Sequence, residues 1–443
     1  MAAMAGNEAT RYDRYLTVQA RKREPSAIRS LLKHMSKPNA ISLGGGMPNP
    51  DTFPITKLSF TMLSPEGDEV EMNIDNISET LQYTPSAGLP ALVKLLGDFQ
   101  DHFHSPPAKC RENRGIFVST GSQDAVTKAL ECLVETTDTI LVEDVTYSSV
   151  LSFLKAHGCK MAPVKTDWFG LVPSELDTML SSWTQNHPDQ PKPKVLYVIP
   201  TGSNPRGTSL SKERRHELYA VACKHDLLIL EDDPYYFMQY CDDKDWLPSL
   251  YSMDVEERVV RFDSFSKIIA AGLRIGFMTG PKQIIDRVLL MQQVTELHTS
   301  GVSQSIVYAM LQKWQFDGFR AHVRHLANFY MERRDALYMS IDTHLPGEMI
   351  SLAMPDAGMF IWLKLDFVKD TRTFAKELVE DLGILVVAGH CFSSTSENIP
   401  FVRLSYSLAA EGDMDNAMLR LGEALRKYDR EHLDGIFSMR EYL

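Results

Sequence analysis

Short apolar segments rich in β-branched residues alternate with helical segments between about residues 115 and 280. The apolar segments, each expected to be a strand, span residues 116–118, 139–142, 195–199, 227–230, 259–262 and 275–278. The helical segments among them span 122–134, 148–156 and 212–225. Strands that alternate with helices pair in parallel, and the helices cover both faces of the sheet. The pattern therefore predicts an α/β domain with a mostly parallel sheet.

The pattern changes after residue 280. Helical segments near 281–298 and 303–314 precede a longer one near 318–340, which we expect to bridge to a second unit. Further strands are expected at 359–365, 384–387 and 402–406, and further helices near 371–381 and 411–428. The polar segment 183–194, rich in Pro, Asn and Gln, is expected to be a loop.

These elements divide the chain into three parts. Residues 1–48 form an N-terminal arm that contributes to the smaller domain, 49–325 a large domain, and 326–443 a smaller α+β domain. At 443 residues and 44% hydrophobic content, the chain is long enough for two cores.

Charge and cysteine content narrow the possible partners. A formal net charge of −12 argues against binding to duplex nucleic acid, and no stretch reaches the roughly 18 apolar residues of a membrane span. The six cysteines include no C-x-x-C pair, which fits a reducing compartment. The histidine pairs His102/His104 and His322/His325 have no nearby acid or cysteine set, so we expect no metal.

The N-terminal arm carries no apolar signal core. Its first forty residues are rich in Arg and Lys but are interrupted by Glu8, Asp13 and Glu24, so we expect the cytosol, with the mitochondrion as the alternative. The glycine trio Gly44-Gly-Gly46 is followed by proline where a dinucleotide-binding motif needs a helix. It instead predicts backbone packed close to a ligand or to another chain.

Two segments about thirty-five residues apart carry the most informative chemistry. Glu231-Asp-Asp-Pro-Tyr-Tyr236 closes one apolar segment, and Asp263-Ser-Phe-Ser-Lys267 closes another, with Gly272-Leu-Arg-Ile-Gly276 soon after. Ligands of parallel sheets bind beyond the carboxyl ends of the strands, and Ser122 also follows such an end. An acid, a phenol, a lysine, serines and an arginine are thus expected at one edge.

This set of groups is the one that pyridoxal phosphate needs. Its pyridinium nitrogen needs a partly buried carboxylate, and its aldehyde needs a lysine amine. Its phosphate needs hydroxyl groups, backbone N–H groups and a bidentate cation. Candidates for these roles, in the same order, are Asp232, Lys267, Ser264, Ser266 and Arg274.

Four segments make the resemblance to a family specific. Pro200-Thr-Gly-Ser-Asn-Pro-Arg-Gly207, Glu231-Asp-Asp-Pro-Tyr-Tyr236, Ser264-Phe-Ser-Lys267 with Gly272-Leu-Arg-Ile-Gly276, and Val402-Arg-Leu-Ser405 resemble the signature segments of class I pyridoxal-phosphate aminotransferases of fold type I. The kynurenine/α-aminoadipate aminotransferase branch is the most similar, with further likeness at 41–50, 81–88 and 263–269. The resemblance runs from about residue 29 to 405 and implies a large mostly parallel domain with a smaller α+β domain.

The resemblance implies three catalytic residues. Lys267 resembles the Schiff-base lysine that later moves the proton from the substrate Cα. Asp232 resembles the partner of the pyridinium nitrogen, and Asp233 competes for this role. The family spacing favours Asp232, three residues before Tyr235, which resembles the tyrosine bonded to the phenolic oxygen of the cofactor.

Further cofactor contacts follow from the same resemblance. Asn204 resembles the amide that also donates to the phenolic oxygen, and a turn asparagine is the alternative. Tyr147 resembles the aromatic residue that stacks on the ring, and a core aromatic is the alternative. Phosphate contacts are implied for Ser122, Gln123, Ser264, Ser266 and Arg274. Ser122 could equally be an ordinary helix N-cap.

Four positions in these loops depart from the family pattern or from its nearest members. Arg206 stands where threonine is usual, and Val145 stands where proline is usual. Thr201 and Ser203 also replace asparagines of the nearest relatives. These departures put the contacts and rigidity of both loops in question.

The substrate contacts implied by the resemblance lie at the two ends of the chain. Arg403 alternates with apolar neighbours and resembles the arginine that binds the substrate α-carboxylate; an internal ion pair is the alternative. Tyr83 resembles the tyrosine that reaches the cofactor of the neighbouring subunit, which implies a homodimer with shared sites. Arg29 and Gly46 are candidates for contacts with the substrate, and an exposed helix arginine is the alternative for Arg29.

The sequence thus predicts a homodimeric pyridoxal-phosphate aminotransferase with a ping-pong mechanism. The expected donors are kynurenine, 2-aminoadipate and aromatic or other large L-amino acids, and the expected acceptor is a 2-oxo acid, 2-oxoglutarate first. A lyase or decarboxylase of the same fold is the alternative within the enzymes. A transcription regulator that senses pyridoxal phosphate is the alternative outside them, but the 40-residue arm is too short for a DNA-binding extension.

Overall fold

The computed structural model describes residues 11–26, 46–64, 67–366, 368 and 370–432. Its central element is a seven-stranded sheet in the order β3-β11-β10-β9-β8-β4-β5. The strands are β3 (Arg114–Ser119), β4 (Thr139–Glu143), β5 (Lys160–Val164), β8 (Val195–Val198), β9 (Leu228–Asp232), β10 (Val259–Ser264) and β11 (Gly276–Pro281). Neighbours from β10 to β5 pair in parallel. The predicted α/β class is confirmed.

Both faces of this sheet are buried, which explains why its strands read as continuous apolar segments. Leu228 and Leu230 pack in one apolar cluster, and Ile229 between them packs in another. The first cluster includes α6 (Ser122–Leu133), α7 (Ser148–His157) and α11 (Lys282–Thr295). The second includes α8 (Pro173–Ser181) and α10 (Lys212–His225). Side chains alternate along β9 as a strand requires.

Strand β11 departs from the expected parallel series. It runs antiparallel to both β10 and β3. Only the 3₁₀ turn η5 (Ala271–Leu273) lies between β10 and β11, whereas a parallel pair needs a longer crossover. This direct return carries Lys267 and Arg274 on one short connection at the carboxyl edge of β10.

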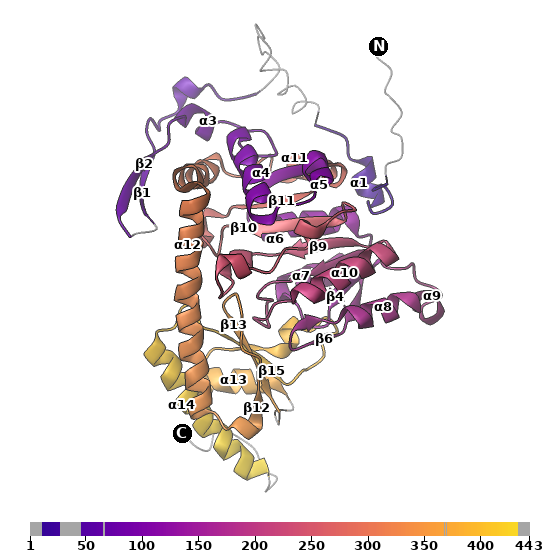
Figure 1. The fold of residues 1–443 in the computed structure, drawn as a ribbon, viewed down its shortest axis with the longest axis vertical. Coiled ribbons are helices and arrows are strands. Elements are labelled where there is room, and N and C mark those ends of the chain that lie inside the picture. The colour runs from indigo at the N-terminus through magenta and orange to yellow at the C-terminus, as the bar shows by residue number, and fades with distance from the viewer. Residues whose placement is uncertain (1–10, 27–45, 65–66, 367, 369, 433–443) are drawn as a thin grey trace.

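The long helix α12 (Gly301–His344) leads from the seven-stranded sheet to a second sheet (Figure 1). It contains one non-helical residue, Gln315, with φ of 51°, which divides it near the expected boundary between two helical segments. The second sheet is antiparallel in the order β12-β13-β15-β14. Its elements are β12 (Ile350–Ser351), β13 (Phe360–Leu365), β14 (Val387–Ala388), β15 (Phe401–Ser405), α13 (Thr371–Leu382) and α14 (Glu411–His432).

The strand expected at 384–387 is mostly absent. Helix α13 ends with Gly383 in the left-handed conformation, and the Ile384 N–H donates to Leu378 O at 2.9 Å. Ile384 therefore closes the helix end and leaves only Val387 and Ala388 for β14.

Several elements were not predicted from the pattern. The hairpin of β1 (Ser59–Leu63) and β2 (Glu69–Asn73) is followed by α3 (Ile77–Leu81) and α4 (Pro90–His104). The segment 183–194 begins with a short helix rather than being loop throughout. The remaining elements are α5 (Ala108–Asn113), β6 (Thr166–Asp167), β7 (Gly170–Leu171), α9 (Trp183–Asn186), η1 (Pro50–Thr52), η2 (Tyr236–Met238), η3 (Asp243–Asp245), η4 (Tyr251–Met253), η6 (Gly347–Met349) and η7 (Gly389–Phe392).

The described part of the N-terminal arm packs on the larger sheet. Tyr12, Tyr15 and Leu16 belong to the same apolar cluster as α6 and α11, and α1 (Val18–Lys22) begins where the Thr17 N–H donates to Cys132 O at 2.8 Å. Residues 11–26 thus pack on the larger sheet, and the assignment of residues 1–48 to the smaller domain stays a prediction. The rest of the arm up to residue 45 lies outside the described residues.

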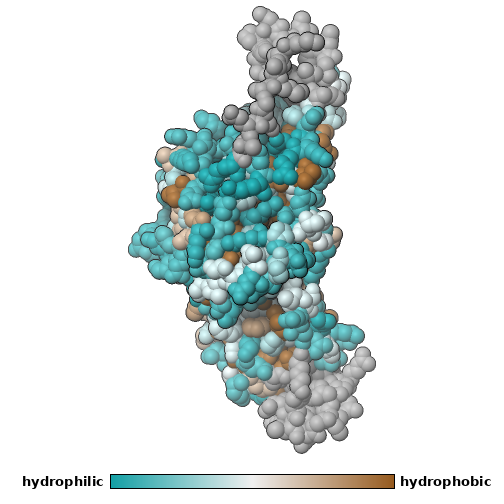
Figure 2. All heavy atoms as spheres, turned by 90° about the vertical axis from the view of Figure 1, so that its right-hand side faces the viewer, coloured by the Kyte–Doolittle hydropathy of each residue, from teal (hydrophilic) through white to brown (hydrophobic). Residues whose placement is uncertain are grey.

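Hydrophilic side chains dominate the face of the molecule shown in Figure 2, and apolar ones form small separate patches there. Within the described ranges, no helix is long and apolar enough to cross a membrane.

Candidate active site

A cavity of about 420 Å³ opens at the carboxyl edge of the larger sheet. Its walls come from the ends of β9 and β10, the start of α6, and strands β13 and β15 of the second sheet. Eleven candidate residues line it, namely Ser122, Gln123, Tyr147, Asn204, Asp232, Tyr235, Ser264, Ser266, Lys267, Arg274 and Arg403. Tyr83 and Gly46 do not line it, and Arg29 lies outside the described residues.

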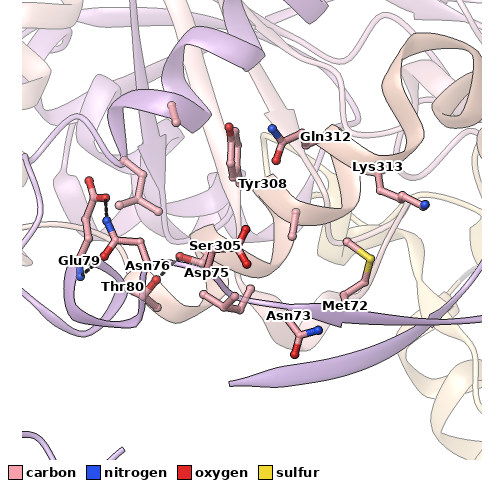
Figure 3. Close-up of a pocket in the computed structure, with 14 residues that line it drawn as sticks. Met72, Asn73, Asp75, Asn76, Glu79, Thr80, Ser305, Tyr308, Gln312 and Lys313 are labelled. Carbon is pink, nitrogen blue, oxygen red and sulfur yellow. Dashed lines mark hydrogen bonds between the residues drawn. The ribbon is translucent and has the colours of Figure 1, made fainter. Parts of the chain in front are cut away.

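A second cavity of about the same volume, 420 Å³, lies between the β1–β2 hairpin, α3 and α12 (Figure 3). Two pairs of its polar side chains bond to each other: Asn76 Nδ2 donates to Glu79 Oε2 at 2.7 Å, and the hydroxyls of Thr80 and Ser305 lie 2.8 Å apart. The cavity at the sheet edge instead brings a lysine, an acid and two arginines together. We therefore take the sheet-edge cavity as the candidate site.

Lys267 follows β10 and is half-buried in this cavity. Burial lowers the pKa of its amine, and the nearby positive charges of Arg274 and Arg403 lower it further. A lowered pKa makes the neutral amine, which is the nucleophilic form, more available.

Asp232 is the acid that faces the cavity. It ends β9, is only 4% exposed, and accepts a hydrogen bond from the Tyr197 hydroxyl at Oδ2 at 2.6 Å. Its Oδ1 is buried and has no hydrogen-bond partner in the described residues. Burial raises the pKa of the Asp232 carboxyl to about 7, against the lowering effect of Tyr197. A cation placed in the cavity would reverse that shift.

Asp233 points away from the cavity into a buried ion cluster. The Arg261 guanidinium lies 2.9 Å from Asp233, 2.9 Å from Asp263 and 3.3 Å from Glu231, and all four side chains are buried. A buried arginine needs such anions, because an unpaired internal charge is strongly unfavourable. This cluster fixes the end of β9 against β10 and directs Asp233 away from the cavity that Asp232, the acid favoured by the family spacing, lines.

A cup for an anion lies at the other end of the cavity. Ser122 and Gln123 begin α6, whose free N–H groups and dipole favour negative charge. Arg274 donates to Ser266 Oγ at 3.0 Å and to Thr120 O at 3.2 Å. A Cβ at Gly276 would lie 2.6 Å from Ser122 N, so glycine lets β11 pass beside the helix start.

Arg403 lies on β15 and reaches the cavity from the second sheet. Its Nη1 donates to Asn204 Oδ1 at 2.9 Å, and its guanidinium lies 4.2 Å from the centre of the Phe360 ring and 5.0 Å from that of Phe392. Burial lowers its pKa, and its buried Nε has no hydrogen-bond partner in the described residues. Across the described ranges, no carboxylate forms an ion pair with it. Its remaining N–H groups can therefore donate to the oxygens of an external carboxylate.

Some residues of the cavity were not predicted from the sequence. Ile199, Met359 and Phe360 line it, and Tyr197 acts on it through Asp232. Tyr197 is the only residue with a hydroxyl group in its apolar segment, which was the one available signal. Met359 and Phe360 are typical core residues of a strand, so nothing in their pattern distinguished them.

Comparison with known proteins agrees with this chemistry. The sequence model of the family "Aminotransferase class I and II" matches residues 61–421. This chain belongs to that family. The predicted family and enzyme class are confirmed, and the protein is a pyridoxal-phosphate-dependent aminotransferase of fold type I.

Similar proteins cover nearly the whole chain. The kynurenine/alpha-aminoadipate aminotransferase, mitochondrial, of Bos taurus is 39% identical over 94% of this chain and 99% of its own. The aminotransferase tdiD of Emericella nidulans is 34% identical over 91% of this chain and 93% of its own.

Solved structures of aminotransferases share this fold. Aminotransferase Aro8 from Candida albicans has a TM-score of 0.85 and 31% identity, covering 93% of this chain and 97% of its own. The kynurenine aminotransferase of Pyrococcus horikoshii, determined with PMP, kynurenine and its product, has a TM-score of 0.75 and 25% identity, covering 94% of this chain and 98% of its own.

The residues of the cavity fit the cofactor of this family. The unpartnered Asp232 Oδ1 can accept from a ring N–H, and the start of α6 with Arg274 can hold a phosphate. Lys267 lies in the same cavity as both groups. A carboxylate, an amine and an anion cup are the three requirements of pyridoxal phosphate.

Proposed function

We propose that this aminotransferase moves the amino group of kynurenine, 2-aminoadipate, or an aromatic or other large L-amino acid to a 2-oxo acid, 2-oxoglutarate first, in a ping-pong cycle. The observation that carries the proposal is Arg403, a half-buried guanidinium without a carboxylate partner in the described residues, in the cavity of Lys267. A carboxylate held by Arg403 places the substrate in that cavity. The names of similar proteins, which include kynurenine, α-aminoadipate and aromatic amino acid aminotransferases, support the donor class.

Lys267 is proposed to act twice in the cycle. It anchors the cofactor. Once freed, its Nζ takes the proton from the substrate Cα and delivers it to the cofactor. When bound, pyridoxal phosphate supplies the electron sink that stabilises negative charge at that carbon. The lowered pKa of Lys267 provides the neutral amine that accepts the proton.

The other polar residues are proposed to hold the ring and the phosphate. Asp232 pairs with the ring nitrogen, while Tyr235 and Asn204 donate to its phenolic oxygen and Tyr147 stacks on the ring. Ser122, Gln123, Ser264, Ser266 and Arg274 bind the phosphate. The support is that all nine residues line one cavity.

The active enzyme is proposed to be a homodimer with shared sites. Tyr83 is 47% exposed and does not line the cavity of its own chain, although the sequence predicts a cofactor contact for it. Its ring packs edge-on against that of His298, with 5.9 Å between the ring centres, so the half-exposed side chain lies against a supporting ring. A second subunit would contact this side chain. Arg29 and Gly46 are proposed to contact the substrate side chain from the arm.

The compartment of the enzyme stays a prediction. We expect the cytosol, and the mitochondrial names of three mammalian relatives make the mitochondrion the alternative. Fractionation of cells that express the chain with a C-terminal tag separates the two.

A half-reaction screen tests the proposed function. Single amino acids are added to the cofactor-loaded protein, and kynurenine, 2-aminoadipate or aromatic donors should convert its visible absorption to that of pyridoxamine phosphate. Borohydride reduction should attach the cofactor to Lys267, and Lys267→Ala should abolish turnover. Lys282→Ala, which changes an exposed lysine paired with Asp286, is the matched control and should keep activity. An adduct at another lysine, or no conversion by any amino acid, would overturn the proposal.

A further inference from the structure

Arg206 joins two loops that line the active-site cavity. Its Nη2 donates to Asp144 Oδ1 at 2.9 Å and also to the Thr166 hydroxyl, and its side chain is 7% exposed. Thr166 in turn donates to both carboxylate oxygens of Asp144, through its hydroxyl and through its N–H. Arg206, Asp144 and Thr166 thus form one closed set of hydrogen bonds, although only Arg206 is fully buried.

Each loop joined by this ion pair carries a residue of the cavity. Asn204 lies two residues before Arg206, and Tyr147 lies three residues after Asp144. Neither loop is a regular helix or strand at these positions. The ion pair therefore fixes the distance between two segments that strand pairing does not hold directly.

The positive charge of Arg206 lies near two acids, Asp144 and Glu143. Glu143, next to Asp144, is buried and accepts a long hydrogen bond, 3.4 Å, from the Ile199 N–H. Burial raises the pKa of Glu143 to about 7, and Arg206 is the positive charge that lowers it. Asp144 is 38% exposed, so only the arginine side of this ion pair is buried. Removing Asp144 would leave the buried Arg206 guanidinium without its carboxylate, which is more damaging than the loss of a partner for an exposed arginine.

The joined loops also contact the C-terminal part of the chain, including strand β15 and the segment that follows η7. Asp144 O accepts from Ser394 N at 3.0 Å and from Ser394 Oγ at 3.1 Å. Asn204 Oδ1 accepts from Arg403 Nη1 at 2.9 Å. A shift of either loop would therefore be passed to the guanidinium that reaches the cavity from β15.

We propose that Arg206 is a positioning residue for the cofactor and the substrate carboxylate. Its ion pair with Asp144 sets the places of Asn204 and Tyr147 in the cavity and, through Asn204, the place of Arg403. This inference rests on the proposed function of these residues and adds a residue that touches neither the cofactor nor the substrate.

A double-mutant cycle with Arg206→Met, Asp144→Asn and the double variant tests this role. The readouts are the cofactor dissociation constant, from fluorescence quenching of the cofactor-free protein, and KM and kcat for the amino donor. We expect each single variant to weaken cofactor binding and raise KM by about tenfold, and the double variant to be no worse than either one. Arg206→Lys, which keeps the charge, should recover part of the loss.

The matched control is the pair of Arg214 and Asp167, whose side chains are 25% and 42% exposed and whose closest atoms lie 2.5 Å apart. Arg214→Met should leave the cofactor dissociation constant and KM within about twofold of wild type, because Arg214 is more exposed than Arg206 and neither residue of this pair lines the cavity. The inference is overturned if Arg206→Met behaves like Arg214→Met, or if the effects of Arg206→Met and Asp144→Asn simply add.

Two further outcomes are distinguishable. A wild-type protein that binds no cofactor would overturn the proposed function, whereas a working wild type with unaffected Arg206 variants would overturn only this inference. If Arg206→Met does not fold, the isosteric Asp144→Asn carries the test. Wild-type cofactor affinity and KM in that variant would then overturn the inference.

Discussion

Tyr197 is the residue that acts most directly on the acid of the cavity. Its hydroxyl is fully buried and donates to Asp232 Oδ2 at 2.6 Å. Hydrogen bonds to charged groups contribute about 1.5–3 kcal/mol. We therefore expect Tyr197→Phe to weaken pyridoxal phosphate binding about tenfold or more, measured by absorbance titration of the cofactor-free protein.

Tyr219→Phe is the matched control for that change. The Tyr219 hydroxyl also donates to a buried carboxylate, Asp254, at 2.9 Å, but neither residue lines the cavity. This variant should lose stability while keeping the affinity for the cofactor. Equal cofactor affinities of Tyr197→Phe and the wild type would contradict the role of Tyr197.

The raised pKa of Asp232 predicts the pH dependence of stability without cofactor. The pKa of its carboxyl rises from 3.8 to about 7 in the folded protein. The folded state therefore binds the proton more tightly, and its stability falls as the pH rises through this window. The loss for this group is about 4 kcal/mol between pH 4 and 8.

Urea unfolding of the cofactor-free protein at pH 5 and pH 8 measures this dependence. Asp232→Asn should show a smaller loss between the two values, while Glu143 and Glu231, whose pKa values are also raised, keep part of it. An identical pH dependence in the variant and the wild type would contradict the prediction.

Single site residues could be predicted from the sequence where an unusual combination of polar side chains follows an apolar strand. Lys267 and Asp232 stand at strand ends beside serines and a tyrosine, and both line the cavity. Tyr197 was not predicted, because a single hydroxyl in an apolar strand does not show that its side chain meets an acid from the next strand. Whether each residue performs its expected role stays a prediction.

At the scale of elements, β11 and α6 approach too closely for any side chain at Gly276. A Cβ there would lie 2.6 Å from Ser122 N and 2.8 Å from Asp263 O. We expect Gly276→Ala to shift the start of α6, to reduce stability by about 1–3 kcal/mol, and to weaken binding of the cofactor phosphate. Thermal unfolding and cofactor titration measure the two effects.

Gly272→Ala is the comparison for that variant. A Cβ at Gly272 would have no atom within 4 Å, although this glycine also lies between β10 and β11. It should therefore bind the cofactor like the wild type. Similar affinities of the two alanine variants would show that the close approach is unimportant.

Most elements of the larger sheet could be predicted from the sequence pattern. Because both faces of the sheet are covered, its strands are continuous apolar segments, and helical segments separate most of them. The β1–β2 hairpin was missed although its strands alternate polar and apolar residues, because each strand is only five residues long. Strand β14 was overestimated, because the same apolar residues that suit a strand also close the end of α13. Competition between two local structures cannot be resolved from pattern alone.

At the scale of the whole molecule, shared sites predict recovery of activity in hybrid dimers. In a dimer of Tyr83→Phe and Lys267→Ala chains, one site contains an intact lysine and an intact tyrosine from the other subunit. We expect about half of the wild-type activity per hybrid dimer, measured on purified heterodimers with two different tags.

A pair of changes within one site provides the control. Hybrid dimers of Asp232→Asn and Lys267→Ala chains should be no more active than the Asp232→Asn homodimer. The reason is that both residues line the cavity of their own chain, so neither hybrid site is intact. Absence of recovery in the Tyr83→Phe hybrid would contradict shared sites and leave the cavity complete within one chain.

The cavity includes Ser122, near the start of the larger sheet, and Arg403, on β15 of the second sheet. During synthesis the N-terminal part of a chain emerges from the ribosome first. A complete cavity therefore forms only after residue 403 has emerged and β15 has paired with β13. A ligand that contacts the whole cavity binds, and so stabilises, only chains in which the cavity is complete. The cofactor thus favours the survival of full-length chains over truncated ones in the cell.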